Sequence, residues 1–164
     1  INSCSGFKSA NLLGTISTKG ITNVAVFSSV THLGSNPPTL GFILRPTTVP
    51  RNTHKNLKDL GYFTINHIWE EVIEDAHHTS AKYPDDVSEF DMTNFEAEFK
   101  GNFKDVMLVV AQIQELYVKD ELLQNDGLIN LSLGNIATIN GLDTYAIPKF
   151  KKQLTYQRPK EIKK

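Results

Sequence analysis

The chain has 164 residues, a formal net charge of −1 and a single cysteine, Cys4. This length suits one domain with a real core. The near-neutral charge, without a basic stripe, argues against a nucleic-acid partner. The apolar runs are too short to span a membrane, and no signal-peptide pattern opens the sequence. A lone cysteine excludes an intrachain disulfide, and we expect a cytoplasmic, reducing environment.

Short apolar runs separated by turn residues recur along the chain. Such runs predict strands, and the residues between them predict hairpins and loops. The expected strands cover residues 11–16, 22–33, 39–44, 62–68 and 107–119, with short ones at 128–133 and 137–139. Gly20 lies in a short connection that is typical of a hairpin. Pro37 and Pro38 are expected to stop strand pairing and to force an extended loop.

Two helical segments are expected between these strands. The first covers residues 53–60, with Asn52 or Thr53 as its cap and Gly61 at its end. The second is a short acidic helix or turn over residues 70–76. Many strands, few helices and frequent turn residues favour a mainly β barrel or sandwich.

Residues 23–30 have apolar side chains on both faces of the expected strand. A strand of this kind is buried on both sides. It therefore has more apolar surface than one small core hides, which predicts a partner subunit.

Cationic and hydroxyl side chains gather between the strand at 39–44 and the first helix. They are Arg45, Thr47, Thr48, Arg51 and Thr53. Hydroxyls, arginine forks and the free N–H groups of a helix start suit a bound phosphate. The alternative is that both arginines are ordinary surface residues and that Thr53 only caps the helix.

The order of several short motifs resembles the flavin reductase-like family. In chain order they are KSANLLGT at 8–15, TNVAVFSS at 22–29, SNPP at 35–38, GF at 41–42, RP at 45–46, RNT at 51–53, FTINH at 63–67, HHTSAKY at 77–83 and ATINGLD at 137–143. The resemblance implies an FMN-binding split β-barrel of Greek-key type with a few short helices, formed as a single domain by residues 1–164. It also implies a homodimer whose contact surface borders the flavin pocket.

The resemblance assigns candidate roles to further residues. A flavin ring needs hydrogen bonds at its pyrimidine edge and an apolar wall. The strand and the loop after the acidic helix are implied to supply them, through Asn23, Val26, Phe27, Ser28, Ser29, Ser80, Ala81 and Tyr83. Without the resemblance, the strand would be interpreted as a plain buried strand. The family often has an acidic residue where this chain has Asn52, which leaves the role of Arg51 less defined than that of Thr53.

The implied function is flavin reduction, in which NADH or NADPH passes hydride to non-covalently bound FMN. Two alternatives remain: an electron-transfer flavoprotein reduced by a partner protein, and a non-enzymatic flavin-binding module. No catalytic acid or base is expected, because hydride transfer to a flavin does not require one. His77 and His78 invite a metal interpretation, but no cysteine or carboxylate cluster accompanies them, so no metal is expected.

Two features concern the extent of the chain. It begins at Ile1 rather than at methionine, so we expect a longer gene product. Relatives in the suspected family usually carry a further strand-forming segment where this chain has residues 102–106. We expect that a loop is missing from the sequence there, because loss of barrel strands would open sheet edges.

Overall fold

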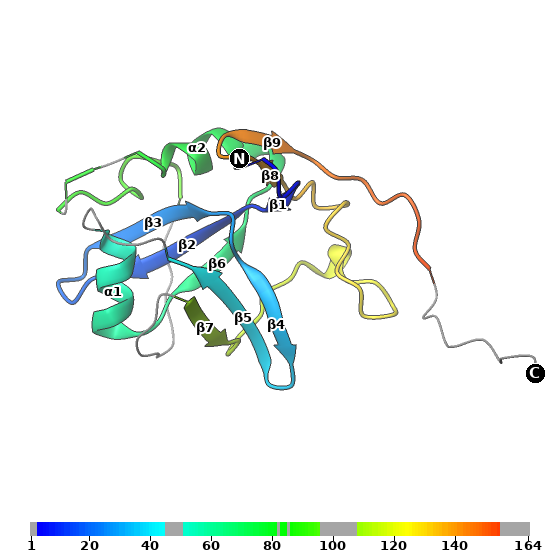
Figure 1. Cartoon of the computed structure of the whole chain (residues 1–164), viewed down its shortest axis with the longest axis horizontal. Coiled ribbons are helices and arrows are strands. Elements are labelled where there is room, and N and C mark those ends of the chain that lie inside the picture. The colour runs from blue at the N-terminus through cyan, green and yellow to red at the C-terminus, as the bar shows by residue number, and fades with distance from the viewer. Residues whose placement is uncertain (1–2, 45–50, 82, 85, 96–107, 155–164) are drawn as a thin grey trace, which may run out of the picture.

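The structure is a computed structural model that describes residues 3–44, 51–81, 83–84, 86–95 and 108–154. Within these residues, the strands form three antiparallel sheets of three strands each (Figure 1). The expected mainly β fold with a few short helices is therefore confirmed. The segment at 102–106 and the candidate residues Arg45, Thr47 and Thr48 lie outside the described residues.

The first sheet has the order β3-β2-β6. It consists of β2 (Asn11–Ile16), β3 (Thr22–Phe27) and β6 (Thr64–His67). β2 is the central strand, and Asn11 pairs with Phe27 on one side and with His67 on the other. The predicted strand 22–33 is wrong in extent, because the chain leaves this sheet after Phe27.

The second sheet has the order β4-β5-β7. It consists of β4 (Thr31–Ser35), β5 (Pro38–Ile43) and β7 (Leu108–Gln112). The extended loop predicted at Pro37 and Pro38 is wrong, because β4 and β5 form a tight hairpin in which Ser35 pairs with Pro38. Pro38 lacks an N–H group but still accepts a hydrogen bond from Ile113 N at 2.9 Å, so a proline is tolerated at the first position of β5.

The third sheet has the order β1-β8-β9. It consists of β1 (Lys8–Ser9), β8 (Thr138–Asn140) and β9 (Thr144–Ala146). The helical elements are α1 (Asn52–Leu60), η1 (Glu70–Val72), α2 (Ile73–His78) and η2 (Asp120–Leu122). α1 packs against β2 and β3. None of the described helices combines the length and the apolar character that a membrane crossing needs.

One hydrophobic core fills the space between the first two sheets and α1. Phe42 lies at its centre, and its ring meets Phe27 at 5.3 Å and Phe63 at 5.2 Å, both edge to face. Each such pair stabilises by about 0.5–1.5 kcal/mol beyond simple burial. Leu13, Leu44 and Leu57 complete the buried part of this core.

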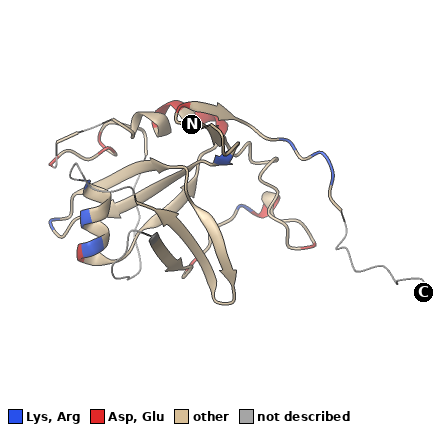
Figure 2. Ribbon diagram, viewed as in Figure 1, with Lys and Arg blue, Asp and Glu red and all other residues tan. Residues whose placement is uncertain are grey.

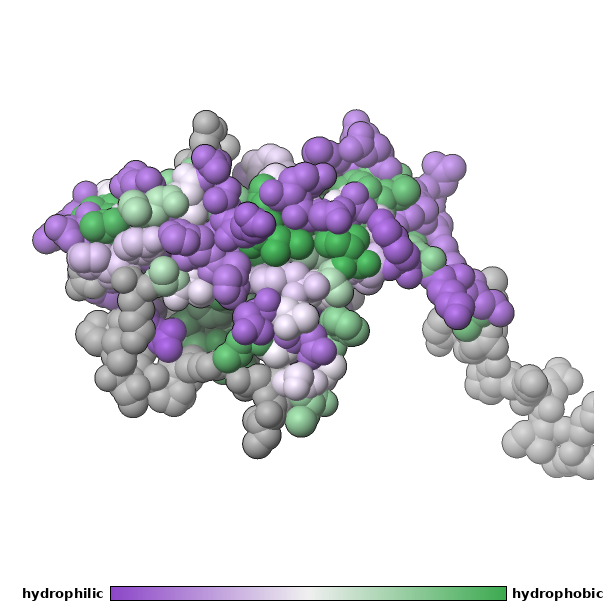
Figure 3. All heavy atoms as spheres, turned by 90° about the horizontal axis from the view of Figure 1, so that it is seen from above, coloured by the Kyte–Doolittle hydropathy of each residue, from purple (hydrophilic) through white to green (hydrophobic). Residues whose placement is uncertain are grey.

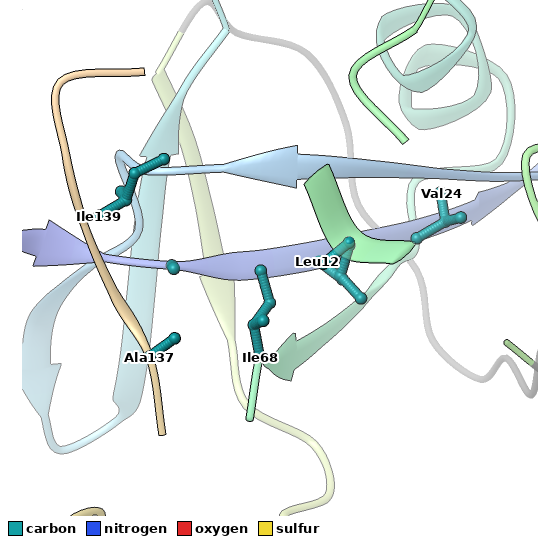
Figure 4. Packing of buried hydrophobic residues seen from close by; sticks show 7 residues of the cluster. Leu12, Val24, Ile68, Ala137 and Ile139 are labelled. Atoms are coloured by element: carbon teal, nitrogen blue, oxygen red, sulfur yellow. The ribbon is translucent and has the colours of Figure 1, made fainter. Parts of the chain in front are cut away.

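A second core covers the opposite face of the first sheet. Leu12 and Val24 point into it from β2 and β3, and Ile68, Ala137 and Ile139 meet them (Figure 4). β3 therefore sends Val24 into this core and Phe27 into the first one. The prediction of an apolar strand with two buried faces is confirmed for β3.

The strand predicted at 107–119 is wrong beyond its first part. β7 ends at Gln112, and residues 113–119 form no regular strand. The short strand predicted at 128–133 is also wrong, because Ile129 makes only an isolated bridge to Leu123. The alternating apolar residues of this region have no sheet neighbour within the described chain, and alternation alone does not form a strand.

Candidate functional site

Four buried polar side chains join α1 to the first sheet. The amide of Asn23 donates to Thr15 Oγ1 at 3.3 Å and to Thr53 Oγ1 at 3.1 Å. The amide of Asn56 donates to Thr15 Oγ1 at 3.1 Å. We call Thr15, Asn23, Thr53 and Asn56 the polar network; each of them is at least 95% buried. The structure thus brings together two predicted site residues, Asn23 and Thr53, and adds two that the sequence analysis missed.

The network holds the start of α1 in place. The buried residues of α1 are Thr53, Asn56 and Leu57, which share one helix face at spacings of three and four. The predicted cap is wrong: Asn52 and Thr53 are the first helical residues, and Arg51 occupies the cap position without a side-chain cap bond. Thr53 hydrogen-bonds to β3 instead of closing its own helix.

The first turn of α1 is suited to an anion. It contains no acidic residue, and no side chain caps its free N–H groups. Lys55 lies near the start of this helix, whereas Lys58 is in its last turn beside Asp59; Figure 2 shows the lysines in blue and the aspartate in red. Free amides at a helix start and nearby positive charge both favour a bound phosphate or carboxylate.

The rest of the predicted ring platform is divided between the cores and the end of β3. Val26 and Phe27 are half-buried and pack against the second and first cores. Ser29 Oγ accepts a hydrogen bond from Ile43 N at 3.0 Å, which ties the end of β3 to β5. Ser28 lies between Phe27 and Ser29 in the sequence, directly after the last residue of β3. Ser29 is therefore hydrogen-bonded to β5, and Ser28 precedes it in the segment that leaves β3.

The loop after α2 lies over β3, as the green segment in Figure 1 shows. Ala76 of α2 packs in the same core as Val24 of β3. Ser80 and Ala81 follow in an exposed turn, and Tyr83 hydrogen-bonds to His78. The backbone N–H groups of Ser80 and Ala81 donate to His77 and His78, so the described hydrogen bonds of these three predicted residues run to α2 rather than to β3.

His77 packs against Tyr145 of β9. Its Nδ1 lies 3.4 Å from the hydroxyl of Tyr145, and the two rings pack edge to face. Burial, aided by the negative charge of Asp143, raises the pKa of Tyr145, so this hydroxyl stays protonated. Among the described residues, no three His, Cys, Asp or Glu side chains gather as metal ligands would.

The sequence analysis also missed the residues that close the free edge of β3. Glu89 Oε2 accepts a hydrogen bond from Val24 N at 3.2 Å, and Ser88 Oγ lies 2.7 Å from Thr22 Oγ1. Burial raises the pKa of the Glu89 carboxyl. The sequence did not single out Ser88 and Glu89, because polar residues in a loop-like stretch are equally typical of a loop exposed to solvent.

Comparison with known proteins identifies the family and the fold. The family model described as "Flavin reductase like domain" matches residues 6–112. A provisionally named flavin reductase with a split barrel domain from Shewanella frigidimarina is 38% identical, with a TM-score of 0.86 over 95% of this chain and 89% of that chain. An FMN-binding protein from Thermus thermophilus shares the fold at 15% identity, with a TM-score of 0.72 over 93% of this chain and 92% of that chain.

A curated relative from Aquifex aeolicus, an uncharacterised protein, is 33% identical over 88 residues. The match covers 52% of this chain and 45% of that protein, so the two share about half of their length. The family match, the identity to the Shewanella protein and the observed sheets agree with one another. This chain belongs to the flavin reductase-like family and has its split-barrel fold.

Proposed function

We propose that this protein binds FMN non-covalently and acts as a flavin reductase that uses NADH or NADPH. The observation that carries the proposal is the buried hydrogen bond between Asn23 of β3 and Thr53 of α1. It holds the strand expected to bind the flavin ring against the helix start expected to bind the phosphate. The FMN-binding protein from Thermus, which shares the fold, agrees with this choice of cofactor.

The described residues fit a phosphate at the start of α1. No side chain caps the N–H groups of the first turn, and that turn contains no acidic residue. Arg51, which precedes it, is exposed. Phosphate oxygens accept hydrogen bonds and carry charge, so they match these donors. Arg45, Thr47 and Thr48 directly precede this helix in the sequence and would add further donors.

The described residues also limit where the ring can lie. Ser88 and Glu89 already occupy the edge of β3 at Thr22 and Val24. The ring therefore belongs beside the later part of the strand, near Ser28 and Ser29, and the family resemblance adds Ser80, Ala81 and Tyr83 as further contacts. Backbone groups there would orient the pyrimidine edge, and nearby apolar side chains would exclude water.

FMN, when bound, supplies the redox chemistry: it takes a hydride from a reduced nicotinamide and returns electrons to an acceptor. The protein's residues have binding and orienting roles in this proposal. None of them is needed as an acid or base, because hydride transfer to a flavin requires neither. The nicotinamide must approach one open face of the ring.

We also propose that a second copy of this chain covers an exposed apolar lobe. The lobe comprises residues 112–136 and 147–154, and none of residues 112–136 is buried. Leu116, Leu133 and Leu154 are each more than 60% exposed. Ordering a backbone costs roughly 1–2 kcal/mol per residue, so an ordered segment with no buried side chain needs a partner surface.

The charges of the lobe favour a second copy as that partner. Its acidic residues are Glu115, Asp120, Glu121 and Asp126, and its basic residues are Lys119, Lys149, Lys151 and Lys152. A twofold arrangement can place the basic stretch of one copy against the acidic stretch of the other. Figure 1 shows the lobe projecting from the sheets, and Figure 3 shows apolar surface near the middle of the molecule as seen from above.

The function is tested by titrating the flavin-free protein with FMN and with riboflavin. A charge-assisted hydrogen bond contributes about 1.5–3 kcal/mol, so riboflavin should bind at least about tenfold more weakly. Anaerobic addition of NADH or NADPH should then bleach the absorbance of bound FMN. Equal affinities would contradict the phosphate site. Tight FMN binding without bleaching would instead indicate a flavin-binding module or a protein reduced by a partner.

A further inference from the structure

Each hydrogen bond of the polar network has a defined donor and acceptor, and this assignment limits which ligand atoms Thr53 can bind. Each of the two N–H groups of the Asn23 amide is used, one by Thr15 and one by Thr53. Thr53 Oγ1 is therefore an acceptor toward Asn23, and its own proton must go to another atom. Among the described residues no acceptor takes that proton, although Thr53 is only 5% exposed.

Thr15 and Asn56 make the other hydrogen bonds of the polar network. Thr15 Oγ1 accepts from both Asn23 and Asn56, so two amides converge on one hydroxyl oxygen. Asn56 lies one turn after Thr53 on the buried face of α1. The hydrogen bonds thus connect Asn56 of α1 to Thr15 of β2, Thr15 to Asn23 of β3, and Asn23 to Thr53 of α1. The chain of contacts begins and ends in the first part of the same helix.

We propose that Thr15 and Asn56 are positioning residues of the phosphate site. They hold the Asn23 amide so that Thr53 presents its hydroxyl as a donor at the start of α1. A phosphate group offers only acceptors to such a donor, so the network favours FMN over an uncharged flavin. The inference rests on the proposed function, because it attributes the preference for a phosphorylated flavin to Thr15 and Asn56, which do not contact the phosphate.

The test compares Thr15→Val and Asn56→Ala with the control Thr22→Val. Thr15→Val keeps the side-chain shape but removes the oxygen on which both amides converge. Thr22 lies on the same sheet and hydrogen-bonds to Ser88, away from α1. FMN and riboflavin dissociation constants are measured for each variant by flavin fluorescence.

Both network variants should weaken FMN binding about tenfold, as expected for loss of residues that support a binding group. Riboflavin binding should change less than about twofold, because riboflavin lacks the group that Thr53 contacts. Thr15→Ser should restore FMN affinity, and Thr22→Val should leave both affinities unchanged. Equal losses for the two flavins, or no loss for either, would overturn the inference.

Amide hydrogen exchange of the flavin-free protein provides a second readout. Exchange over residues 52–60 should be faster in Thr15→Val than in Thr22→Val, since α1 would be held less firmly. Unchanged exchange there would overturn the positioning role. If the unmodified protein binds FMN and riboflavin equally, the phosphate site of the proposed function fails, and with it the preference assigned to the network. Faster exchange in Thr15→Val would then support only the anchoring of α1.

Discussion

The backbone N–H of Val24 donates to Glu89 Oε2 at 3.2 Å, so a buried carboxylate closes the free edge of β3. Unpaired edges invite association with other strands. Only 8% of the Glu89 side chain is exposed, and Phe90, which follows it, packs against the core that contains Val24. The segment around Glu89 is therefore part of the barrel's structure as well as a border of the proposed ring site.

Stability should depend on the protonation of Glu89. Burial raises its pKa above the ordinary value of 4.5, so the folded protein binds this proton more tightly than the unfolded chain does. The contribution of Glu89 is most favourable below pH 4.5 and is lost as the pH rises through the raised pKa. Glu89→Gln, which does not titrate, should show a flatter melting temperature across that window.

Thermal melts from pH 4 to pH 8 check this prediction. Glu71→Gln, a change at an exposed glutamate outside the lobe, is the matched control and should keep the unmodified profile. The same pH profile in Glu89→Gln and in the unmodified protein would show that Glu89 does not set it.

Much of the sheet architecture could be predicted because local pattern and tertiary packing agree there. β2, β3 and β6 fall within the expected strands, and β5 begins at Pro38, one residue before the strand expected at 39–44. The strand predicted through residues 113–119 failed because its alternating apolar residues have no sheet neighbour in the described chain. Leu116 is 68% exposed, which agrees with the proposed partner surface and not with a paired strand.

The site was predictable only in part. Asn23 and Thr53 stood out through motif resemblance, whereas Thr15 and Asn56 look like ordinary strand and helix residues. Hydrophobic periodicity could not find Asn56, because two of the three buried residues of α1 are polar. A helix spacing of three between Thr53 and Asn56 was the one available signal.

Gly41→Ala should destabilise the barrel. A Cβ atom at Gly41 would lie 2.6 Å from Leu33 Cδ1 and 3.1 Å from the backbone oxygen of Val109. The leucine end can move, but the β5-β7 pairing holds Val109, so we expect a loss of about 1–3 kcal/mol. Urea denaturation measures the change. Gly34→Ala, where the nearest atom is 3.5 Å away, is the control with a loss below about 0.5 kcal/mol.

Thr53→Val should weaken both the fold and FMN binding. It keeps the side-chain shape but leaves one Asn23 N–H without its acceptor, which costs about 1–3 kcal/mol of unfolding free energy. Loss of the hydroxyl should also lower FMN affinity about tenfold. Thr53→Ser, which retains the hydroxyl, should preserve both. A folded Thr53→Val protein with full FMN affinity would place the phosphate away from the start of α1.

The last prediction concerns the exposed lobe. If a second copy covers it, light scattering should give a mass of about twice the 18.4 kDa of one chain. Leu133, which is 64% exposed, lies within the lobe, and Leu133→Asp should shift the protein to a monomer because a buried unpaired carboxylate disfavours the contact. Met92→Asp is the control, since Met92 is 49% exposed but lies outside the lobe.

Flavin release should accompany this dissociation, because the family resemblance implies that the subunit contact borders the flavin pocket. Dilution of the unmodified protein should lower the mass and release FMN over the same concentration range, and Leu133→Asp should bind FMN more weakly than Met92→Asp does. A stable monomer that retains FMN would show that one chain completes the site alone, and a Leu133→Asp dimer would move the contact to another surface.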